Sequence, residues 1–393
     1  MYDALVVGAG AAGNYVAYRL ASQGYDVLVF EEHEQIGQPV QCTGIIGAEC
    51  FDLFPLFEGT VLREVRSAKL FSPSGRELRI WRDSIQAYIV DRAAFDRMLA
   101  EKAQQQGAQY LLGSRVRDIA VLDEGVRMEI EGQGQETAFD GRTAIIASGF
   151  GSRLPMKLGL GRIDDLVVGA QAEVSIDGIG EIEVYFDQEM APGFFAWLVP
   201  TSEGRALVGL FSRQNPGARL QNLLSSLYLQ GKIASPDADI THGGIPLRPL
   251  PQTYLNRLLV VGDAAGQVKP TSGGGIYYGL ICAEIAADTL HQALSGNELS
   301  SKLFASYQKR WRQRLGRELR IGYLARRLYQ RMSNHRIDKI FDIVESRGIH
   351  QALLESPDLS FDWHGDVILA GLKHLAPWRQ LFGWRKNPLG EKA

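Results

Sequence analysis

The first 31 residues contain an apolar strand, a glycine-rich turn, a helix and a second strand in close succession. The first strand leads into Gly8, Gly10 and Gly13 with the spacing Gly-x-Gly-x-x-Gly, and the second strand ends at Glu31. Gly8 permits a tight turn, Gly10 lets the backbone approach a pyrophosphate, and Gly13 allows close packing of the helix on the strand. Glu31 is placed to accept hydrogen bonds from an adenosine ribose. The segment therefore predicts a Rossmann-like unit that binds a dinucleotide at a helix N-terminus.

A strand and turn much later in the chain bear on which dinucleotide is bound. Residues 257–263 form an apolar strand that ends in Gly262-Asp263. Ligands of open α/β sheets bind at the carboxyl ends of strands. Together with residues 143–149, an apolar strand ending in small residues, this segment resembles the fingerprints of the glutathione-reductase and hydroxybenzoate-hydroxylase flavoproteins. In that group the aspartate holds the ribityl chain, so the resemblance implies FAD as the cofactor.

Length and composition are those of a soluble enzyme with several domains. At 393 residues the chain exceeds one ordinary core, so we expect two or three domains. A net charge of −3 gives no general case for nucleic acid. Three cysteines argue against a disulfide framework and for a reducing compartment, and their spacing fits no zinc site, so no metal is predicted. We see neither a signal peptide nor a membrane-spanning run, and expect a cytoplasmic protein.

The order of strand and helix patterns predicts an α/β chain, α+β overall, in three parts. The Rossmann-like FAD-binding domain is discontinuous and comprises residues 1–60, 88–165 and 255–300. The substrate-binding domain is an antiparallel sheet built from residues 61–87 and 166–254. Residues 301–393 are expected to form a helical C-terminal region. We read residues 166–250 as mostly strands that form a wall of the substrate cavity.

The loop after the second strand is predicted to lie beside the flavin, and it contains Cys42 and Gly44. The Cys42 thiol either lies near the isoalloxazine or is a small buried residue in a turn, because free cysteines are often inert. Arg92 begins a helix capped by Asp91, where this superfamily uses Arg or Gln to contact FAD. A solvated surface arginine is the alternative there.

A second loop, residues 269–276, follows Asp263 and contains three consecutive glycines. Their bare backbone N–H groups can approach the pyrimidine end of a flavin at a helix N-terminus. A helix is expected from Ile276 through Leu290. A plain flexible loop is the alternative, and the helix that follows directly argues against it.

Phe195 and Trp197 alternate on a strand, so both side chains project to one face. Two large aromatic side chains on one face, beside a flavin, suit an apolar substrate. A stripe of the hydrophobic core is the alternative interpretation of the same pattern.

At these residues the chain resembles the geranylgeranyl reductase family. Its members carry Tyr-x-Trp-x-Phe-Pro after a Pro-Gly. Here Phe195-Ala-Trp197-Leu-Val199-Pro200 follows Pro192-Gly193, with Phe195 in place of Tyr and Val199 in place of Phe. The resemblance spans about residues 1–330 and includes Cys42 and the segment 263–279. By position it implies FAD contacts from Gly8, Gly10, Ala12, Gly13, Glu31, Cys42, Gly44, Arg92, Val116, Asp263, Gly275 and Ile276.

In that family, reduced flavin saturates isolated double bonds of prenyl chains, so a prenyl lipid or prenyl diphosphate is the implied substrate. Phe195 and Trp197 become catalytic candidates, because aromatic faces can stabilise positive charge that develops on carbon. Cys42 is a candidate proton donor, and Phe195, Trp197 and Pro200 are implied substrate contacts. Only one full Gly-x-Gly-x-x-Gly follows a strand. The electrons are therefore expected from transiently bound NADPH or from a separate electron-carrier protein.

Three other functions remain open on the sequence alone. A flavin-dependent monooxygenase of the hydroxylase type has the same architecture. A flavin-dependent halogenase carries Trp-x-Trp-x-Ile-Pro, of which this chain lacks the first Trp. A non-catalytic flavoprotein that binds and presents isoprenoid lipids is an alternative from another class.

The C-terminal third combines basic and apolar residues at helical spacing, which predicts peripheral contact with the inner face of the cell membrane. The basic residues of its first segment are Lys309, Arg310, Arg312, Arg314, Arg317, Arg320, Arg326, Arg327 and Arg331. The interleaved apolar residues are Trp311, Leu315, Leu319, Leu324 and Leu328. A second mixed segment contains Trp378, Arg379, Leu381, Phe382, Trp384, Arg385 and Lys386. A solvated basic helix packed on the flavin domain is the alternative.

Overall fold

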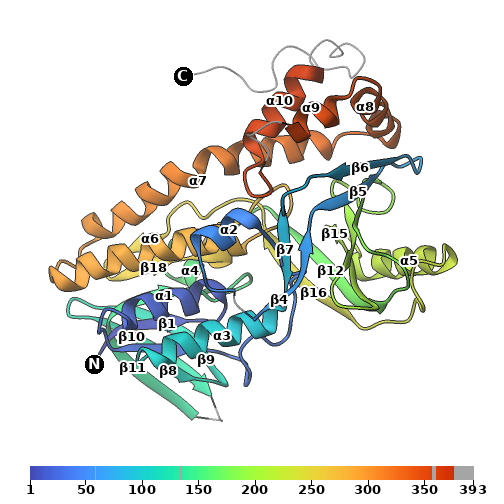
Figure 1. Ribbon diagram of the computed structural model, residues 1–393. Helices are drawn as coiled ribbons and strands as arrows, with labels where there is room; N and C mark the ends of the chain where they lie inside the picture. Colours follow the sequence, from blue (N-terminus) through green and yellow to red (C-terminus); the bar gives the residue numbers. More distant parts are fainter. Residues whose placement is uncertain (58, 133–134, 356–359, 376–393) are drawn as a thin grey trace.

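The computed structural model describes residues 1–57, 59–132, 135–355 and 360–375, and within them it contains three sheets and a helical C-terminal region (Figure 1). The predicted fold class is confirmed: a Rossmann-like unit, a largely antiparallel sheet and C-terminal helices are all present. Among the described residues, none of the helices has the length and apolar character needed to cross a bilayer.

The Rossmann-like unit is built on an eight-stranded sheet whose central strands run parallel. Its main path is β17 (Tyr254–Leu255), β18 (Leu258–Val260), β11 (Gln135–Ile146), β1 (Tyr2–Val7), β2 (Val27–Phe30) and β8 (Gln109–Leu111). Strands β9 (Ser114–Val121) and β10 (Val126–Gly132) continue from β11 as an antiparallel extension. The last four residues of β1 are buried, as expected for a parallel strand covered on both faces.

Helices cover one face of this sheet, and the strand extension covers the other. The helices are α1 (Ala11–Ala21), α3 (Arg92–Gln105) and α6 (Ile276–Ser295), whose apolar sides share one core. The predicted cap of α3 is present, since Asp91 accepts a hydrogen bond from the Ala94 N–H at 2.9 Å. The short helix α4 (Leu154–Lys157) packs on the other side, against β9.

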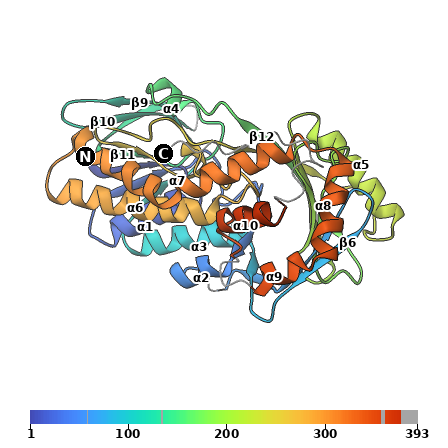
Figure 2. The same ribbon diagram turned by 90° about the horizontal axis from the view of Figure 1, so that it is seen from above.

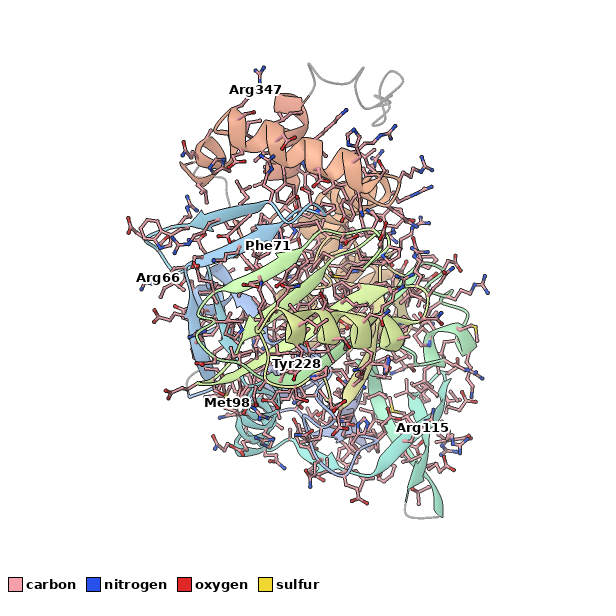
Figure 3. All side chains as sticks on the ribbon, turned by 90° about the vertical axis from the view of Figure 1, so that its right-hand side faces the viewer. Arg66, Phe71, Met98, Arg115, Tyr228 and Arg347 are labelled. Carbon is pink, nitrogen blue, oxygen red and sulfur yellow. The ribbon has the colours of Figure 1, made fainter. Side chains whose placement is uncertain are left out.

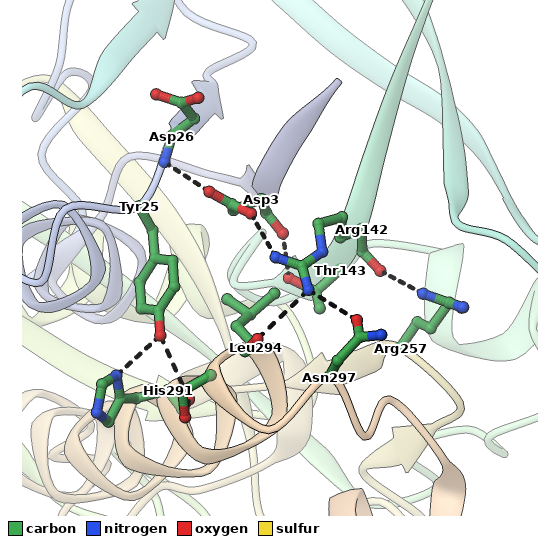
Figure 4. Close-up of polar contacts among 10 residues, drawn as sticks. Asp3, Tyr25, Asp26, Arg142, Thr143, Arg257, His291, Leu294 and Asn297 are labelled. Atoms are coloured by element: carbon green, nitrogen blue, oxygen red, sulfur yellow. Dashed lines mark hydrogen bonds and ion pairs between the residues drawn. The ribbon is translucent and has the colours of Figure 1, made fainter.

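A polar network joins the start of the chain to the segment that returns at residues 255–297 (Figure 4). Arg142 on β11 donates to Asp3 at 2.8 Å and to the side chain of Asn297, just after α6, at 3.0 Å. Nearby, the Tyr25 hydroxyl lies 2.9 Å from Nδ1 of His291 on α6. These contacts hold the sequence-distant parts of the Rossmann-like unit in one block.

The second sheet has seven strands and stands beside the first (Figure 1). Its order is β16 (Ile240–Pro246), β12 (Leu166–Ser175), β15 (Arg205–Ser212), β14 (Ala196–Pro200), β13 (Ile182–Tyr185), β5 (Ser67–Phe71) and β6 (Glu77–Trp81). All neighbours are antiparallel except β13 and β5, which run parallel. The sheet therefore joins strands from residues 61–87 to strands from residues 166–254.

One face of this sheet carries a helix that the strand-rich reading of residues 166–250 did not include. Helix α5 (Pro216–Leu229) packs Leu220, Leu223, Leu224 and Leu227 onto β12 and β15. Figure 3 shows α5, marked by Tyr228, lying across the sheet. The leucine spacing of three and four residues is the helical signal that the strand pattern around it obscured.

A small three-stranded sheet lies between the two larger ones and consists of β3 (Ile45–Gly47), β7 (Ala87–Val90) and β4 (Val61–Val65). Helix α2 (Ala48–Leu53) follows β3 directly. Ile45, Ala87 and Ile89 share an apolar cluster with Trp197 and Phe211 of the seven-stranded sheet. Residues 61–90 are thus divided between two sheets, with β4 and β7 in the small sheet and β5 and β6 in the seven-stranded sheet.

The C-terminal region is helical, as predicted. Its helices are α7 (Ser301–Tyr329), α8 (Asn334–Ser346), α9 (Ile349–Glu355) and α10 (Gly365–Leu375). Seen from above, α7 runs from the Rossmann-like unit, alongside α6, to the seven-stranded sheet (Figure 2). It is the longest described helix and touches both halves of the molecule.

The apolar stripe of α7 does not face outward, which corrects one basis of the membrane prediction. Trp311 and Leu315 are fully buried, Leu319 is 5% exposed, and all three belong to the core of the Rossmann-like unit. The Trp311 indole N–H donates to Thr253 Oγ1 at 3.0 Å. These side chains are used in packing, as in the alternative of a basic helix docked on the flavin domain. The second mixed segment, residues 378–386, lies outside the described residues.

Candidate functional site

The glycine-rich turn between β1 and α1 has the geometry that a dinucleotide requires. Gly8 has a φ of +98°, and a Cβ there would lie 2.5 Å from the carbonyl oxygen of Ala147. A Cβ on Gly13 would lie 2.0 Å from the carbonyl oxygen of Gly8. In contrast, a Cβ on Gly10 would meet nothing within 4 Å. Gly8 and Gly13 are therefore required for packing, whereas Gly10 opens onto free space at the N-terminus of α1.

Glu31, at the end of β2, is held against this turn. Its Oε2 accepts a hydrogen bond from the Ala9 N–H at 2.8 Å, and its Oε1 lies 2.6 Å from Nδ1 of His33. The Glu31 carbonyl accepts from the N–H of Ser114 at 2.8 Å. Val116, two residues further along β9, is buried in the core beneath. Glu31 and Val116, two of the predicted FAD contacts, thus lie in one connected corner of the sheet.

The two fingerprints meet at Ala12 and Gly262. A Cβ on Gly262 would lie 3.2 Å from the Cβ of Ala12, so the turn after β18 contacts the first turn of α1. Asp263 stands in the short 3₁₀ helix Gly262–Ala265, and its Oδ1 would be 2.6 Å from a Cβ on Gly275. Only glycine therefore fits opposite this carboxyl group, at the residue before α6 begins with Ile276.

Burial raises the pKa of Asp263 to about 6, and the positive charge of Arg92 opposes the rise. A carboxyl group that is partly shielded from water and lacks a strong ion pair prefers its neutral form. Hydroxyl groups of a ligand that donated to this carboxylate would stabilise the charged form. Asp263 therefore fits the role of a ribityl acceptor.

Arg92 and Cys42 come together from different segments. The Arg92 guanidinium pairs with Asp96 at 2.5 Å and forms a side-chain contact with the Cys42 thiol. Although burial alone lowers the pKa of Arg92, Asp96 and Cys42 raise it overall. The Cys42 sulfur also accepts from the Gly44 N–H at 3.4 Å. The Arg92 side chain is only 16% exposed, so it is not the solvated arginine of the alternative reading.

Two buried polar atoms in this corner have no partner among the described residues: Nε of Arg92 and Oδ1 of Asp96. Buried polar groups are normally hydrogen-bonded, so unsatisfied atoms beside a glycine-rich opening indicate room for a polar ligand. Gly44 has a φ of +74°, and a Cβ there would lie 2.3 Å from the carbonyl oxygen of Val90. The turn after Cys42 is thereby pressed onto β7, next to α3.

A cluster of aromatic rings, called here the aromatic wall, contains Trp197 of β14, Phe195 just before it and Phe211 of β15. Phe195 and Trp197 have ring centroids 5.9 Å apart, and Phe211 on β15 lies 5.4 Å from Phe195 and 4.7 Å from Trp197. The indole of Trp197 lies over Gly209, where a Cβ would be 2.4 Å from a ring carbon. Pro200 ends β14 and is buried opposite Ala206. Trp197 is 7% exposed, so it is at once part of a packed cluster and part of the wall.

Phe211 links this wall to the glycine loop. A Cβ on Gly273 would lie 2.8 Å from the ring of Phe211, and Gly273 has a φ of +74°. Phe211 was not among the site residues expected from the sequence. The sequence feature that could have identified Phe211 is the alternation of side chains along β15. That alternation places Phe211 on the same face of the sheet as Trp197, which lies on the paired strand β14.

A second feature missed from the sequence is the segment just before α10, which returns to the glycine loop. Asp362 is buried and forms an ion pair with buried Lys269, at the start of that loop. Trp363 donates to Glu49 of α2 at 2.7 Å, and the His364 Nδ1 lies 2.5 Å from Thr271 Oγ1. Burial and the charge of Lys269 lower the pKa of His364 to about 4, which keeps the ring neutral at ordinary pH.

The residues present fit FAD. Gly10 leaves open space at the N-terminus of α1, Glu31 and Asp263 supply carboxylates after β2 and β18, and Arg92, whose charge acts on Asp263, has an unsatisfied nitrogen. The comparisons with known proteins agree with this geometry. The family described as NAD(P)-binding Rossmann-like domain matches residues 6–42.

Two relatives cover most of the chain. Digeranylgeranylglycerophospholipid reductase 2 of Methanopyrus kandleri is 32% identical over 88% of this chain and 91% of its own length. Digeranylgeranylglycerophospholipid reductase of Methanocaldococcus jannaschii is 31% identical over 86% of this chain and 90% of its own length.

A solved structure shares the fold across its whole length. It is a geranylgeranyl bacteriochlorophyll reductase-like protein from Thermoplasma acidophilum, with a TM-score of 0.83 and 22% identity over 97% of this chain and 99% of that one. Identity above 30% over nearly the full length of both curated relatives confirms the predicted family. The chain belongs to the digeranylgeranylglycerophospholipid reductase family.

Proposed function

We propose that this protein is an FAD-dependent reductase that saturates carbon–carbon double bonds in the prenyl chains of a lipid. The observation that carries the proposal is the contact between Phe211 of the aromatic wall and Gly273 of the glycine loop. It joins an apolar surface, suited to a prenyl chain, to the glycine loop, whose Gly275 lies against Asp263. The membership of the family, whose relatives are named as reductases of a prenyl phospholipid, supports the same activity.

Bound FAD, once reduced, supplies a hydride equivalent. The protein's own residues then bind and orient the prenyl chain and shield it from water. Trp197, Phe195 and Phe211 exclude water from the alkene and present π-faces to positive charge on carbon, a stabilisation of about 1–2 kcal/mol per ring when desolvated. Asp263 and the open turn at Gly10 would hold the cofactor.

The Cys42 thiol is the proposed source or carrier of the proton. It lies at the Arg92 guanidinium and accepts from the Gly44 N–H, so its sulfur is oriented by two donors.

The proposal also includes the electron donor and the location of the enzyme in the cell. The chain has one Gly-x-Gly-x-x-Gly unit, so electrons arrive from NADPH bound transiently or from a separate electron-carrier protein. We expect a cytoplasmic enzyme that contacts the inner face of the membrane, since its lipid substrate must be extracted from there. Co-sedimentation with anionic vesicles at low and high salt tests the contact, and no binding at low salt would refute it.

Anaerobic photoreduction of the flavoprotein, followed by separate additions, tests the activity against its alternatives. Reoxidation on adding a prenyl lipid under argon supports a reductase. Reoxidation by oxygen alone, with oxygen or halogen in the product, would instead indicate a monooxygenase or a halogenase. Tight lipid binding without any reoxidation would indicate a carrier protein.

A further inference from the structure

We propose that an arginine cluster where α7 meets the seven-stranded sheet binds the phosphate group of the prenyl substrate. The arginine cluster comprises Arg213, Arg248, Arg326 and Arg327. The inference rests on the proposed function for the identity of the substrate, but the phosphate site itself is argued from the geometry. Figure 2 shows how α7, which carries two of these arginines, reaches the sheet.

Arg326 is the central residue of the cluster. Its side chain is 3% exposed, and its only ionic partner among the described residues is Asp165, at 3.5 Å from Nη2. Nε and Nη1 of the same guanidinium are buried and have no partner within the described ranges. A buried cation with two free donors is costly to a fold. The guanidinium fork matches two oxygens of a phosphate, which would satisfy both donors at once.

The local charge balance favours an anion. Asp165, just before β12, also pairs with Arg213 and accepts from the Tyr323 hydroxyl at 2.8 Å, so its carboxylate is shared among three donors. Arg248 lies 5.4 Å over the ring of Tyr323. Burial lowers the pKa of Arg326, and the charges of Arg213 and Arg327 add to this while Asp165 opposes it. Asp165 thus pairs with Arg213 and Arg326, and the charges of Arg248 and Arg327 act on the neighbouring Tyr323, which leaves a surplus of positive charge.

The arginine cluster is continuous with the aromatic wall. The Arg326 guanidinium lies 4.9 Å from the ring centroid of Phe194, and Phe194 lies 6.2 Å from Phe211. Phe211 in turn contacts Trp197 and the Gly273 position. A substrate with a phosphate at one end and a prenyl chain behind it would contact the arginines and the aromatic rings in that order.

The cluster is also open on one side. Arg213, Arg248 and Arg327 are exposed, whereas Arg326 and Phe194 are buried. One turn before Arg326, a Cβ on Gly322 would lie 3.2 Å from the Thr271 side chain, so α7 presses on the glycine loop here. The polar headgroup therefore stays near solvent while the chain runs inward toward the flavin loop.

Direct binding of inorganic pyrophosphate to the FAD-containing protein tests the site without any turnover. The variants are Arg326→Gln and Arg248→Gln, with Arg320→Gln as the matched control on an exposed turn of α7. Arg213 is left intact because its removal would free Asp165 for Arg326. We expect about tenfold weaker binding for both cluster variants in calorimetry, and wild-type binding for the control. Because the Arg248 side chain is exposed, Arg248→Gln should fold normally. It therefore still tests the site if Arg326→Gln folds poorly. No pyrophosphate binding by the wild type would overturn the proposal.

Steady-state reduction then identifies the source of the phosphate. The KM for digeranylgeranylglyceryl phosphate should rise about tenfold in Arg248→Gln, while that for the uncharged geranylgeraniol stays at the wild-type value. Equal changes for both substrates would overturn the proposal, and so would a change in the KM for NADPH alone. If the wild type reduces no prenyl substrate yet binds pyrophosphate at this cluster, the proposed activity fails and the anion site stands.

Discussion

Lys269 and Asp362 form a buried ion pair that ties the glycine loop of the cofactor site to the segment preceding α10, 93 residues later in the chain. Lys269 is 4% exposed and Asp362 is 1% exposed. A Cβ on Gly47 would overlap the Asp362 carboxylate, so the pair also abuts β3. The C-terminal region is therefore part of the site's framework.

Asp362→Asn should lower the free energy of unfolding by about 3–5 kcal/mol, because it leaves the Lys269 charge buried without a counterion. FAD should also dissociate faster, since Lys269 begins the loop that is proposed to contact it. Chemical denaturation and flavin-fluorescence release measure the two effects. The control is Asp366→Asn, whose partner Arg317 is exposed and which should cost under about 1 kcal/mol. Equal losses in the two variants would contradict the framework role of the buried pair.

Asp263 should make the flavin-free protein less stable as the pH rises. Its folded pKa, about 6, exceeds the ordinary value of 3.8, so the stabilising effect of the proton is complete below about pH 4 and is lost as pH rises through 6. The loss should be at most about 3 kcal/mol and absent in Asp263→Asn. Denaturation of flavin-free protein between pH 4 and 7 measures it. A wild-type profile that matches Asp263→Asn would contradict this assignment.

Asp263→Ala should purify largely without flavin, because it removes the proposed acceptor for the ribityl hydroxyls. The ratio of flavin to protein absorbance measures the effect. Asp118→Ala, an exposed carboxylate on β9, serves as the control and should retain full flavin. Full and tightly held FAD in Asp263→Ala would show that the carboxylate has another role.

Trp197→Ala should reduce prenyl turnover about tenfold or more, because the π-face over the alkene is lost. The flavin spectrum should stay unchanged. Because the residue is also packed, the variant will lose stability too. Leu198→Ala separates the two effects, since Leu198 is equally buried but projects to the opposite face of β14, toward α5. Turnover that falls equally in both variants would assign Trp197 to packing alone.

Cys42→Ser should slow flavin reoxidation by the alkene more than it changes the FAD content, because serine keeps the shape but gives up its proton less readily. Stopped-flow absorbance under argon measures the rate. Cys282→Ala, a buried cysteine in α6, provides the control. Wild-type reoxidation by Cys42→Ser would reduce Cys42 to a packing residue.

The parts of the site that were predictable are those with a local sequence signature. The glycine-rich turn comes directly after a strand and places Gly8, Gly10 and Gly13 at a fixed spacing. Steric limits on the turn then determine its backbone conformation. Asp263 closely follows β18, a strand of the same sheet, so topology brings it to the same edge. Phe195 and Trp197 alternate on one strand, which fixed their common face.

The remaining parts depend on packing between distant segments. Nothing near Asp362 in the sequence indicates that it is buried against Lys269. The basic stripe of α7 looked uniform, yet the structure buries Arg326 and exposes Arg320 on the same helix. From the sequence, Trp311 and Leu315 were equally compatible with a membrane-facing surface, whereas the structure buries both in the core of the Rossmann-like unit. Helical periodicity predicts which residues share one face of a helix, but it does not predict whether that face packs on the protein core or on a membrane.

The most direct test of the central claim is a single turnover with a balanced count of electrons. Photoreduced flavoprotein is mixed under argon with a limiting amount of digeranylgeranylglycerophospholipid, and the oxidised flavin and the lipid mass are both measured. We predict that one double bond is saturated, with a gain of two hydrogens, for each flavin reoxidised. Flavin that stays reduced while the lipid remains unsaturated would contradict it.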